Sequence, residues 1–161
     1  MEVRRIPMEQ LGPLLEQQLE RGSAQLPVTG SSMLPMLRQG RDVVRLVRPD
    51  RPLTRGEVIL YRRENGQYVL HRLIRMEDAA TCLCCGDNQW ERELVPLTQV
   101  VARVDRVCRD GAWIELRSHR GYLCYRTIWT ALFPVRRPVI LLRRLLGRLR
   151  GSINQLRRDA K

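Results

Sequence analysis

The sequence predicts a mainly β domain of antiparallel strands, with one helix before it and amphipathic helices after it. Between residues 23 and 117 the chain consists of short β-branched and apolar runs separated by turn residues, the pattern of strands. On both sides of this segment apolar residues recur at the three- and four-residue spacing of a helix face. With 161 residues and 43% hydrophobic content, the chain has the size and composition of one ordinary domain.

A short amphipathic helix is expected within residues 1–22. Four leucines recur at helical spacing between residues 8 and 20, so they fall on one side of a helix. Gly22 ends this pattern, as glycine commonly does after a last helical turn. The predicted stripe consists of Leu11, Leu14, Leu15 and Leu19.

Two hairpin turns order the strands of the β domain, residues 23–117. Asn65-Gly66 and Asp110-Gly111 each separate two apolar runs, and these dipeptides are the strongest short-range hairpin signals. Strands joined by such short turns are antiparallel. The predicted strand runs are 42–47, 57–62, 67–75, 97–107 and 112–116.

The last segment, residues 118–161, combines helical periodicity with positive charge. The chain has a net charge of +12, but residues 1–116 hold 17 basic and 16 acidic residues, whereas residues 117–161 hold 12 basic and one acidic. Within 138–161 an apolar stripe has most arginines beside it, which is typical of a helix at an anionic membrane surface. A helix packed on the β domain with a solvated arginine face gives the same pattern, so both interpretations stay open.

The cysteines indicate a reducing compartment. Their number, five, is odd, and the start of the chain has no apolar run like that of a signal peptide. Cys82, Cys84 and Cys85 form a cluster, but only Cys108, Cys124 and His119 remain as further ligands at unsuitable spacing. We therefore expect no metal and no other cofactor. No stretch reaches the roughly 20 apolar residues of a spanning helix, so we expect a cytoplasmic protein, peripheral at most to the inner face of the membrane.

The stretch most informative about chemistry surrounds Ser32. Glycine and serine dominate turns for backbone reasons, but Met33 and Leu37 are too apolar for an idle turn. A serine beside a glycine on a tight loop exposes its hydroxyl and presents backbone N–H groups to a developing oxyanion. Ser32 is accordingly the candidate nucleophile.

Four segments between residues 28 and 95 resemble, in order, the conserved boxes of type I signal peptidases and their relatives in the same superfamily. This resemblance implies a signal-peptidase/LexA-like β fold and a serine endopeptidase that cleaves a peptide or small protein. It covers less than half of the chain. The matching segments are Gly30-x-Ser32-Met33-x-Pro35 with the following Gly40-x-Asp42-Val43, then Arg55-Gly56-Glu57-Val58-Ile59, His71-Arg72 and Gly86-Asp87-Asn88.

The resemblance also implies which residue serves as the base. Bacterial signal peptidases and LexA-like repressors pair their serine with a lysine, whereas the archaeal and endoplasmic-reticulum type has a histidine at that position. Here the position holds His71, and the only lysine of the chain is Lys161. A histidine is also the side chain whose ordinary pKa suits it to accept a serine proton. Because His71 shares a face of its predicted strand with Val69 and Leu73, a buried core imidazole is the alternative interpretation.

A carboxylate should orient the imidazole. Asp87 is the first choice, because the corresponding box of the family lies beside its active site, although Gly-Asp-Asn is also turn-rich whatever its function. The histidine-type relatives carry a further aspartate somewhat later, where this chain has Glu93. The expected oxyanion and substrate-binding loop comprises Gly30, Ser31, Met33 and Pro35 with the backbone of Ser32.

Two other functions compete with peptide cleavage in trans. One is a non-catalytic module that binds peptide, lipid or nucleic acid through the basic tail, without sequence-specific nucleic-acid recognition, since no helix-turn-helix, zinc-finger or aromatic stacking pattern is present. The other is self-cleavage, as in LexA-like relatives.

Overall fold

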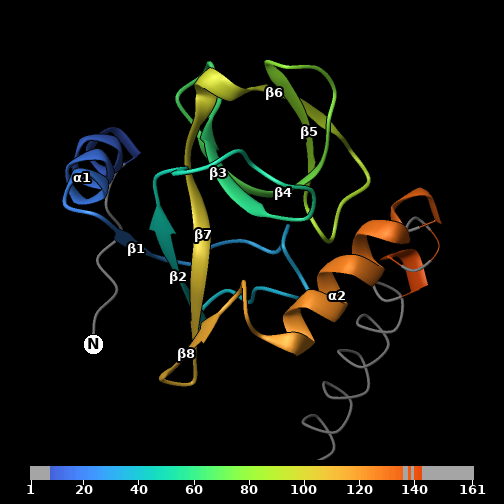
Figure 1. The fold of residues 1–161 in the computed structure, drawn as a ribbon. Coiled ribbons are helices and arrows are strands. Elements are labelled where there is room, and N and C mark those ends of the chain that lie inside the picture. Colours follow the sequence, from blue (N-terminus) through green and yellow to red (C-terminus); the bar gives the residue numbers. More distant parts are fainter. Residues whose placement is uncertain (1–7, 136–137, 139, 143–161) are drawn as a thin grey trace, which may run out of the picture. The chain divides into compact units, whose positions relative to one another are not determined.

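The computed structural model describes residues 8–135, 138 and 140–142 (Figure 1). The chain divides into two compact units, with the boundary after Thr130. Most of the predicted helix at residues 138–161 lies outside the described residues, and of it Pro138 and residues 140–142 are helical. None of the helices in the described part of the chain combines the length and hydropathy needed to cross a membrane.

The first unit is built on one antiparallel sheet, which confirms the predicted mainly β class. Among the described residues the sheet has eight strands in the order β1-β2-β7-β3-β4-β5-β6, and β8 pairs with β7. The edges of this path are therefore β1 and β6. The strands are β1 (Ala24–Pro27), β2 (Asp42–Val47), β3 (Val58–Arg62), β4 (Tyr68–Met76), β5 (Thr81–Cys85), β6 (Glu93–Pro96), β7 (Val100–Arg109) and β8 (Ala112–Glu115), and a 3₁₀ turn, Leu97–Gln99, precedes β7.

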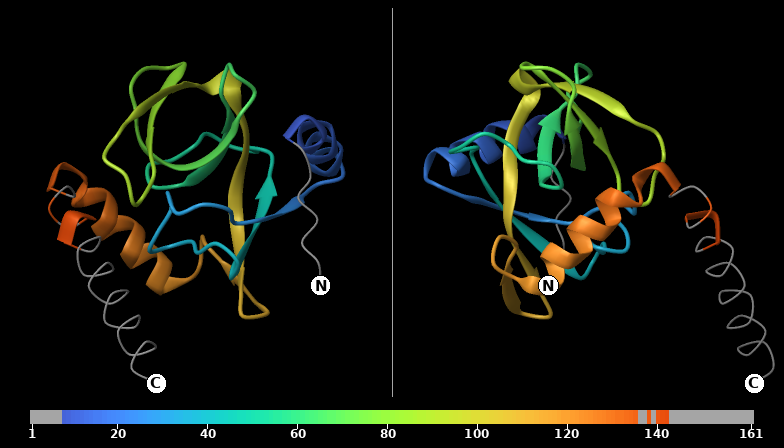
Figure 2. Two further views of the ribbon diagram at one scale, coloured as in Figure 1. Left: turned by 180° about the vertical axis from the view of Figure 1, so that it is seen from behind. Right: turned by 45° about the vertical axis from the view of Figure 1, so that its right-hand side comes forward.

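The long strand β7 joins two halves of the sheet. Its first residues pair with β3, and its remainder pairs with β2 and β8. In Figures 1 and 2, β3 to β6 curl around one end of β7, whereas β2 and β8 lie along its other end. The fold thus separates a half that contains His71 from a half that contains β1, β2 and β8.

Both predicted hairpins are present. Asp110 and Gly111 have φ values of 52° and 83° and connect β7 directly to β8, as a type I′ turn requires. The turn at Asn65-Gly66 is one residue longer: the Arg63 N–H donates to the Gln67 carbonyl over 2.9 Å, and Gly66 has a φ of 82°. The extra residue fits a three-residue hairpin loop that ends in the left-handed region.

The predicted N-terminal helix is confirmed as α1 (Met8–Glu20). Leu15 and Leu19 are buried in the main core, but Leu14 is 47% exposed. The prediction that Leu14 belongs to the buried stripe is wrong, because the face turned to the sheet is centred on Gly12, Leu15 and Leu19, which leaves Leu14 at its flank.

Two apolar cores lie on opposite faces of β3. Alternate residues of a strand point to opposite sides, and here Val58 and Leu60 enter the main core while Ile59 and Tyr61 enter a second, smaller core. This explains why β3 is buried without alternation. The smaller core consists of Ile59, Tyr61, Val69, Leu73, Cys82, Cys84 and Val95.

The helix α2 (Arg120–Ala131) belongs, through Thr130, to the first unit. Its N-terminus is capped by His119, whose Nδ1 accepts the Tyr122 N–H over 3.1 Å, and the Tyr122 side chain enters the main core. The Arg55 guanidinium also donates to the Thr130 carbonyl over 3.2 Å. These contacts extend the unit beyond residue 117, where the sequence pattern puts the end of the β domain. A 3₁₀ turn, Phe133–Val135, follows in the second unit.

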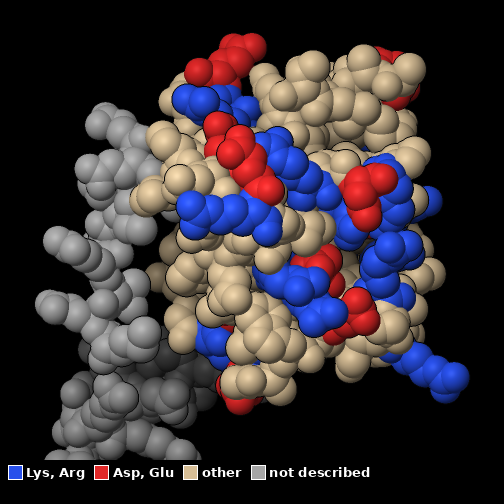
Figure 3. All heavy atoms as spheres, turned by 60° about the vertical axis from the view of Figure 1, so that its left-hand side comes forward, with Lys and Arg blue, Asp and Glu red and all other residues tan. Residues whose placement is uncertain are grey.

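Basic and acidic side chains interleave on the surface of the first unit. On the face shown in Figure 3 they lie side by side rather than in separate patches. Neighbouring strands supply ion pairs, among them Arg45 with Asp105 and Arg109 with Asp42. This face therefore has no extended basic patch.

Candidate functional site

The loop that carries Ser32 joins β1 to β2 and is anchored from within. Met33 and Leu37 are buried in the main core, and the Leu37 N–H donates to the Met33 carbonyl over 2.9 Å. Gly30 has a φ of 75°, in the left-handed region that favours glycine. The anchored apolar residues leave Ser32 half-buried and Ser31 exposed at the surface of the loop.

Of the predicted substrate-binding residues, Met33 is buried inside the domain, whereas Pro35 lines a pocket. The Met33 side chain is only 3% exposed, so it supports the loop from inside and does not face a substrate. Pro35 is half-buried and lines a pocket of about 280 Å³ together with Met36, Tyr122 and Tyr125.

One of the predicted oxyanion donors is already engaged. The Gly30 N–H donates to Oε1 of Gln39 over 3.0 Å. Among the described residues, no acceptor pairs with the N–H of Ser31 or Ser32. The donors left to a substrate oxygen are therefore these two.

The loop after β5 holds the Ser32 backbone. The Asn88 N–H donates to the Ser32 carbonyl over 2.7 Å, and a Cβ at Gly86 would lie 2.8 Å from the same oxygen. A side chain at position 86 would therefore push the two loops apart. Since Cys85 pairs with Arg72, the antiparallel register puts Gly86 level with His71. Through this contact Ser32 lies beside the part of the sheet that carries His71.

His71 lies on β4 opposite Ile59 and faces the second core. It is 3% exposed, as the core interpretation expected. Its Nδ1 is 3.1 Å from the Tyr61 hydroxyl and 3.4 Å from Oε1 of Glu93. A carboxylate at Nδ1 is also the arrangement in which an acid orients the imidazole of a general base.

The surroundings favour a neutral imidazole beside an ionised carboxylate. Burial lowers the pKa of His71, against the opposing charge of Glu93 and with the help of the Arg63 charge. Burial raises the pKa of Glu93, but hydrogen bonds from Arg63 and Tyr61 and the charges of His71 and Arg63 outweigh it, so this pKa ends below its usual value. Neutral histidine is the form that can accept a proton.

The partners of Nδ1 also decide the tautomer. An ionised carboxylate only accepts hydrogen bonds, so an unprotonated Nδ1 would face the Glu93 oxygen with its lone pair. This contact favours the tautomer that has its proton on Nδ1 and the lone pair of a base on Nε2. In the described part of the chain neither His71 Nε2 nor Ser32 Oγ has a hydrogen-bond partner, so the two are not bonded to each other. Bonds of this kind often form only when substrate binds.

Asp87, the first choice for the orienting acid, is paired elsewhere. Its two carboxylate oxygens accept hydrogen bonds from Arg72 at 2.7 and 2.6 Å, and Oδ2 also accepts one from Tyr125 at 3.0 Å. The structure thus brings Glu93, not Asp87, to the imidazole. Asp87 still acts on His71 through its charge, which raises the pKa of the histidine.

Two residues of this site were not singled out by the sequence pattern, namely Tyr61 and Arg63. Arg63 donates to both carboxylate oxygens of Glu93, at 2.8 and 2.5 Å. Alternation along β3 puts Tyr61 on the face that His71 and Val69 share, so the sequence does contain a signal for Tyr61. The pairing of Arg63 with Glu93, 30 residues apart, has no local signal.

The cysteine cluster is part of the core packing. The five cysteines, all of them among the described residues, form no disulfide, and Cys82, Cys84 and Cys85 are buried. The sulfurs of Cys82 and Cys84 lie 3.7 Å apart. Among the described residues no three histidine, cysteine or acidic side chains are grouped closely enough to hold a metal ion.

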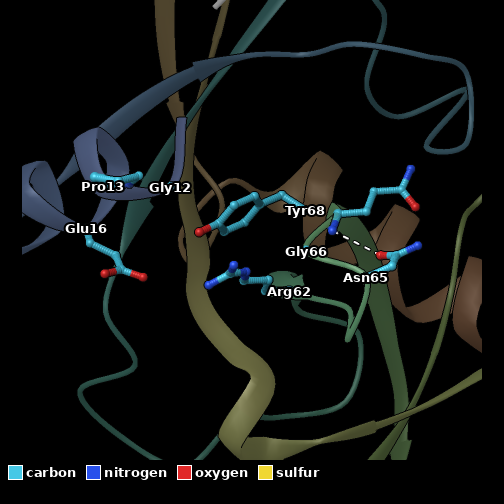
Figure 4. A pocket seen from close by; sticks show the side chains of 8 residues that line it. Gly12, Pro13, Glu16, Arg62, Asn65, Gly66 and Tyr68 are labelled. Carbon is cyan, nitrogen blue, oxygen red and sulfur yellow. Dashed lines mark hydrogen bonds between the residues drawn. The ribbon is translucent and has the colours of Figure 1, made fainter. Parts of the chain in front are cut away.

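A separate pocket of about 540 Å³ lies between α1 and the β3–β4 hairpin (Figure 4). It is lined by Glu16, Arg62 and Tyr68 among others and includes none of the predicted site residues. The Tyr68 hydroxyl is buried, has no hydrogen-bond partner among the described residues and lies directly beside Gly12. Because Arg62 follows Tyr61, its side chain lies on the opposite face of the strand from the His71 site.

Comparisons with protein-family models, with curated proteins and with solved structures find no match to this chain.

Proposed function

We propose that the chain is a serine endopeptidase of the signal-peptidase type, with a signal-peptidase/LexA-like fold. Ser32 is its nucleophile, His71 its general base and Glu93 the acid that orients the base. The observation that carries the proposal is the Nδ1 contact between His71 and Glu93, on a strand level with the loop that binds the Ser32 backbone.

In the proposed reaction His71 Nε2 takes the hydroxyl proton of Ser32 as Oγ attacks the substrate carbonyl carbon. The N–H groups of Ser31 and Ser32 donate to the resulting oxyanion. His71 then gives its proton to the leaving amine as the C–N bond breaks. A water molecule, deprotonated by the same nitrogen, hydrolyses the acyl-enzyme.

The substrate is an extended peptide. β1 is an edge strand of the sheet path and leads directly into the Ser32 loop. An edge strand offers unpaired backbone groups to which a peptide adds as a further strand. Backbone pairing of this kind supplies affinity without dictating the sequence of the peptide.

The enzyme acts in the cytoplasm, and residues 138–161 bind the anionic inner face of the membrane. The support for this part of the proposal is the sequence alone, namely an apolar stripe next to arginines. Liposome sedimentation of the full chain tests it. Binding to vesicles with phosphatidylserine, lost at high salt and after removal of residues 138–161, is the expected result, and recovery of the protein from a compartment outside the cytoplasm would contradict it.

Peptide cleavage is tested with a diverse peptide pool read by mass spectrometry. Ser32→Ala and His71→Ala should each reduce cleavage by about 10²-fold or more. Ser23→Ala and His119→Asn, which change a second serine and the other histidine, should retain it. Absence of cleavage by the folded protein, together with salt-sensitive vesicle or nucleic-acid binding, favours the binding module. A shortened chain that is absent in Ser32→Ala identifies self-cleavage.

A further inference from the structure

We propose that Tyr61 and Arg63 are positioning residues that hold His71 and Glu93 in one proton arrangement, with the proton on Nδ1 and the lone pair on Nε2. Neither residue touches the reacting atoms. The catalytic consequence of this arrangement rests on the proposed function, whereas the arrangement itself is a property of the folded chain.

The geometry of Arg63 fixes the carboxylate. Its Nε and Nη2 donate to the two oxygens of Glu93 over 2.8 and 2.5 Å, a fork that leaves a carboxylate little freedom to rotate. Nη1 donates to Oε1 of Gln67 over 2.5 Å, which holds the guanidinium in turn. Since the Glu93 side chain is 27% exposed, the fork is what keeps its Oε1 within 3.4 Å of Nδ1.

Tyr61 supplies the second oxygen at Nδ1. Its ring is 1% exposed and packed in the second core, and it meets the imidazole edge-on at a centroid distance of 6.1 Å. The hydroxyl is therefore fixed at 3.1 Å from Nδ1 by packing rather than by the hydrogen bond alone. A hydroxyl can accept the Nδ1 proton and donate its own to Glu93, which makes the three groups one network.

The polar groups that act on His71 come from three neighbouring elements. Tyr61 and Arg63 lie at the end of β3, Glu93 begins β6, and Asp87 lies in the loop after β5. The charge of Arg63 lowers the pKa of His71, and those of Glu93 and Asp87 raise it. Removal of the Arg63 charge therefore shifts the balance toward the protonated imidazole.

The same hairpin contains a matched pair of controls. Arg62 and Tyr68 have the same side-chain types, stand directly opposite each other on β3 and β4, and form a cation–π pair at 5.9 Å. They line the pocket between α1 and the β3–β4 hairpin, on the other face of the strands from Tyr61. Changes at Arg62 and Tyr68 test for general disturbance of the hairpin.

The experiment is nitrogen-detected NMR of the imidazoles in the full chain, which has only two histidines. His119→Asn assigns the His71 signals. We expect one tautomer, protonated at Nδ1, in the wild-type chain. Tyr61→Phe should give a mixture of tautomers, and Arg63→Gln should raise the His71 titration midpoint by up to about one pH unit, with Arg63→Lys close to wild type. Tyr68→Phe and Arg62→Gln should leave both quantities unchanged.

Unchanged tautomer and midpoint in Tyr61→Phe and Arg63→Gln would overturn the proposal, whatever the activity. An Nε2–H tautomer in the wild-type chain would overturn it as well. If Arg63→Gln does not fold, Tyr61→Phe carries the test. The expected NMR changes in a chain that cleaves no peptide would support the arrangement and refute the peptidase. Where cleavage is measured, Tyr61→Phe should lower kcat by about tenfold or more and leave KM unchanged.

Discussion

Arg72 and Asp87 form a two-point ion pair in which both side chains are completely buried. All five guanidinium N–H groups have acceptors, because those not directed at Asp87 reach the Gly56 carbonyl, the Tyr122 hydroxyl and the Met36 sulfur. A buried charge pair is tolerated only when it is satisfied in this way. The pair joins β4, the loop that binds the Ser32 backbone, and α2.

Asp87→Asn should therefore destabilise the fold, by about 3–5 kcal/mol, because it leaves the buried Arg72 charge without its counter-ion. Urea unfolding of the full chain measures this. Asp110→Asn is the matched control, since Asp110 pairs with Arg41 at an exposed position, and such pairs contribute about 0–1 kcal/mol. If Asp87→Asn were as stable as the wild-type chain but had lost peptide cleavage, Asp87 rather than Glu93 would be the acid that orients His71.

Glu93→Gln tests the acid that the structure brings to His71. An amide in place of the carboxylate can present an N–H to Nδ1, which favours the tautomer protonated at Nε2 and removes the base. We expect kcat for peptide cleavage to fall by about 10²- to 10⁴-fold. Glu93→Asp should recover part of the activity.

The control for this change is Glu91→Gln, because Glu91 is a nearby exposed carboxylate. It should cleave peptides at the wild-type rate. Equal loss in both variants would mean that the segment before β6, rather than the Glu93 carboxylate, matters for activity.

Much of the fold could be predicted because its signals are local. Asp110-Gly111 permits positive φ at two consecutive residues. Helical spacing marks α1, and β-branched runs between turn residues mark the long strands. β5 and β6 gave no such signal. β5 is buried along nearly its whole length, so its sequence shows no alternation and stands out only as a cluster of cysteines. β6 is four residues long and ends at Pro96.

The residues of the candidate site could likewise be predicted only where their signals are local. Ser32 and His71 stand in short motifs that a reader of the sequence can find, whereas the partner of a charge depends on register between distant strands. Arg72 follows His71 and points to the opposite face, and this arginine takes Asp87. Glu93 reaches His71 because β6 pairs with β5, which pairs with β4, and no local pattern contains that relationship.

The pH dependence of cleavage should follow the lowered pKa of His71. Activity requires the neutral imidazole, so the acid limb of kcat/KM should have its midpoint below the ordinary histidine value of about 6.5. Arg63→Gln should move this midpoint upward. A wild-type midpoint above 6.5 would contradict a base desolvated in this way.

The free energy of unfolding should also fall as the pH falls, because of the same histidine. Between the folded-state pKa of His71 and about 6.5, the unfolded chain binds more protons than the folded one. The contribution of His71 to the free energy of unfolding is therefore fully present above pH 6.5 and is lost as the pH falls below it. Urea unfolding across this range should show the slope in the wild-type chain, and His71→Gln should reduce it.

Removal of the Tyr68 hydroxyl should not lower the free energy of unfolding. This hydroxyl is buried, and none of the residues that the structure describes forms a hydrogen bond with it. Tyr68→Phe therefore removes an unsatisfied group and should leave the free energy of unfolding unchanged or raise it by about 1 kcal/mol. Gly12→Ala should act in the opposite direction, since the new Cβ would lie 2.8 Å from that oxygen and would push α1 away from the hairpin. In Tyr68→Phe the same substitution at Gly12 should cost less, because the oxygen that it meets is gone. Urea unfolding of the two single variants and the double variant measures this coupling, and strictly additive changes would show that Gly12 and Tyr68 are not in contact.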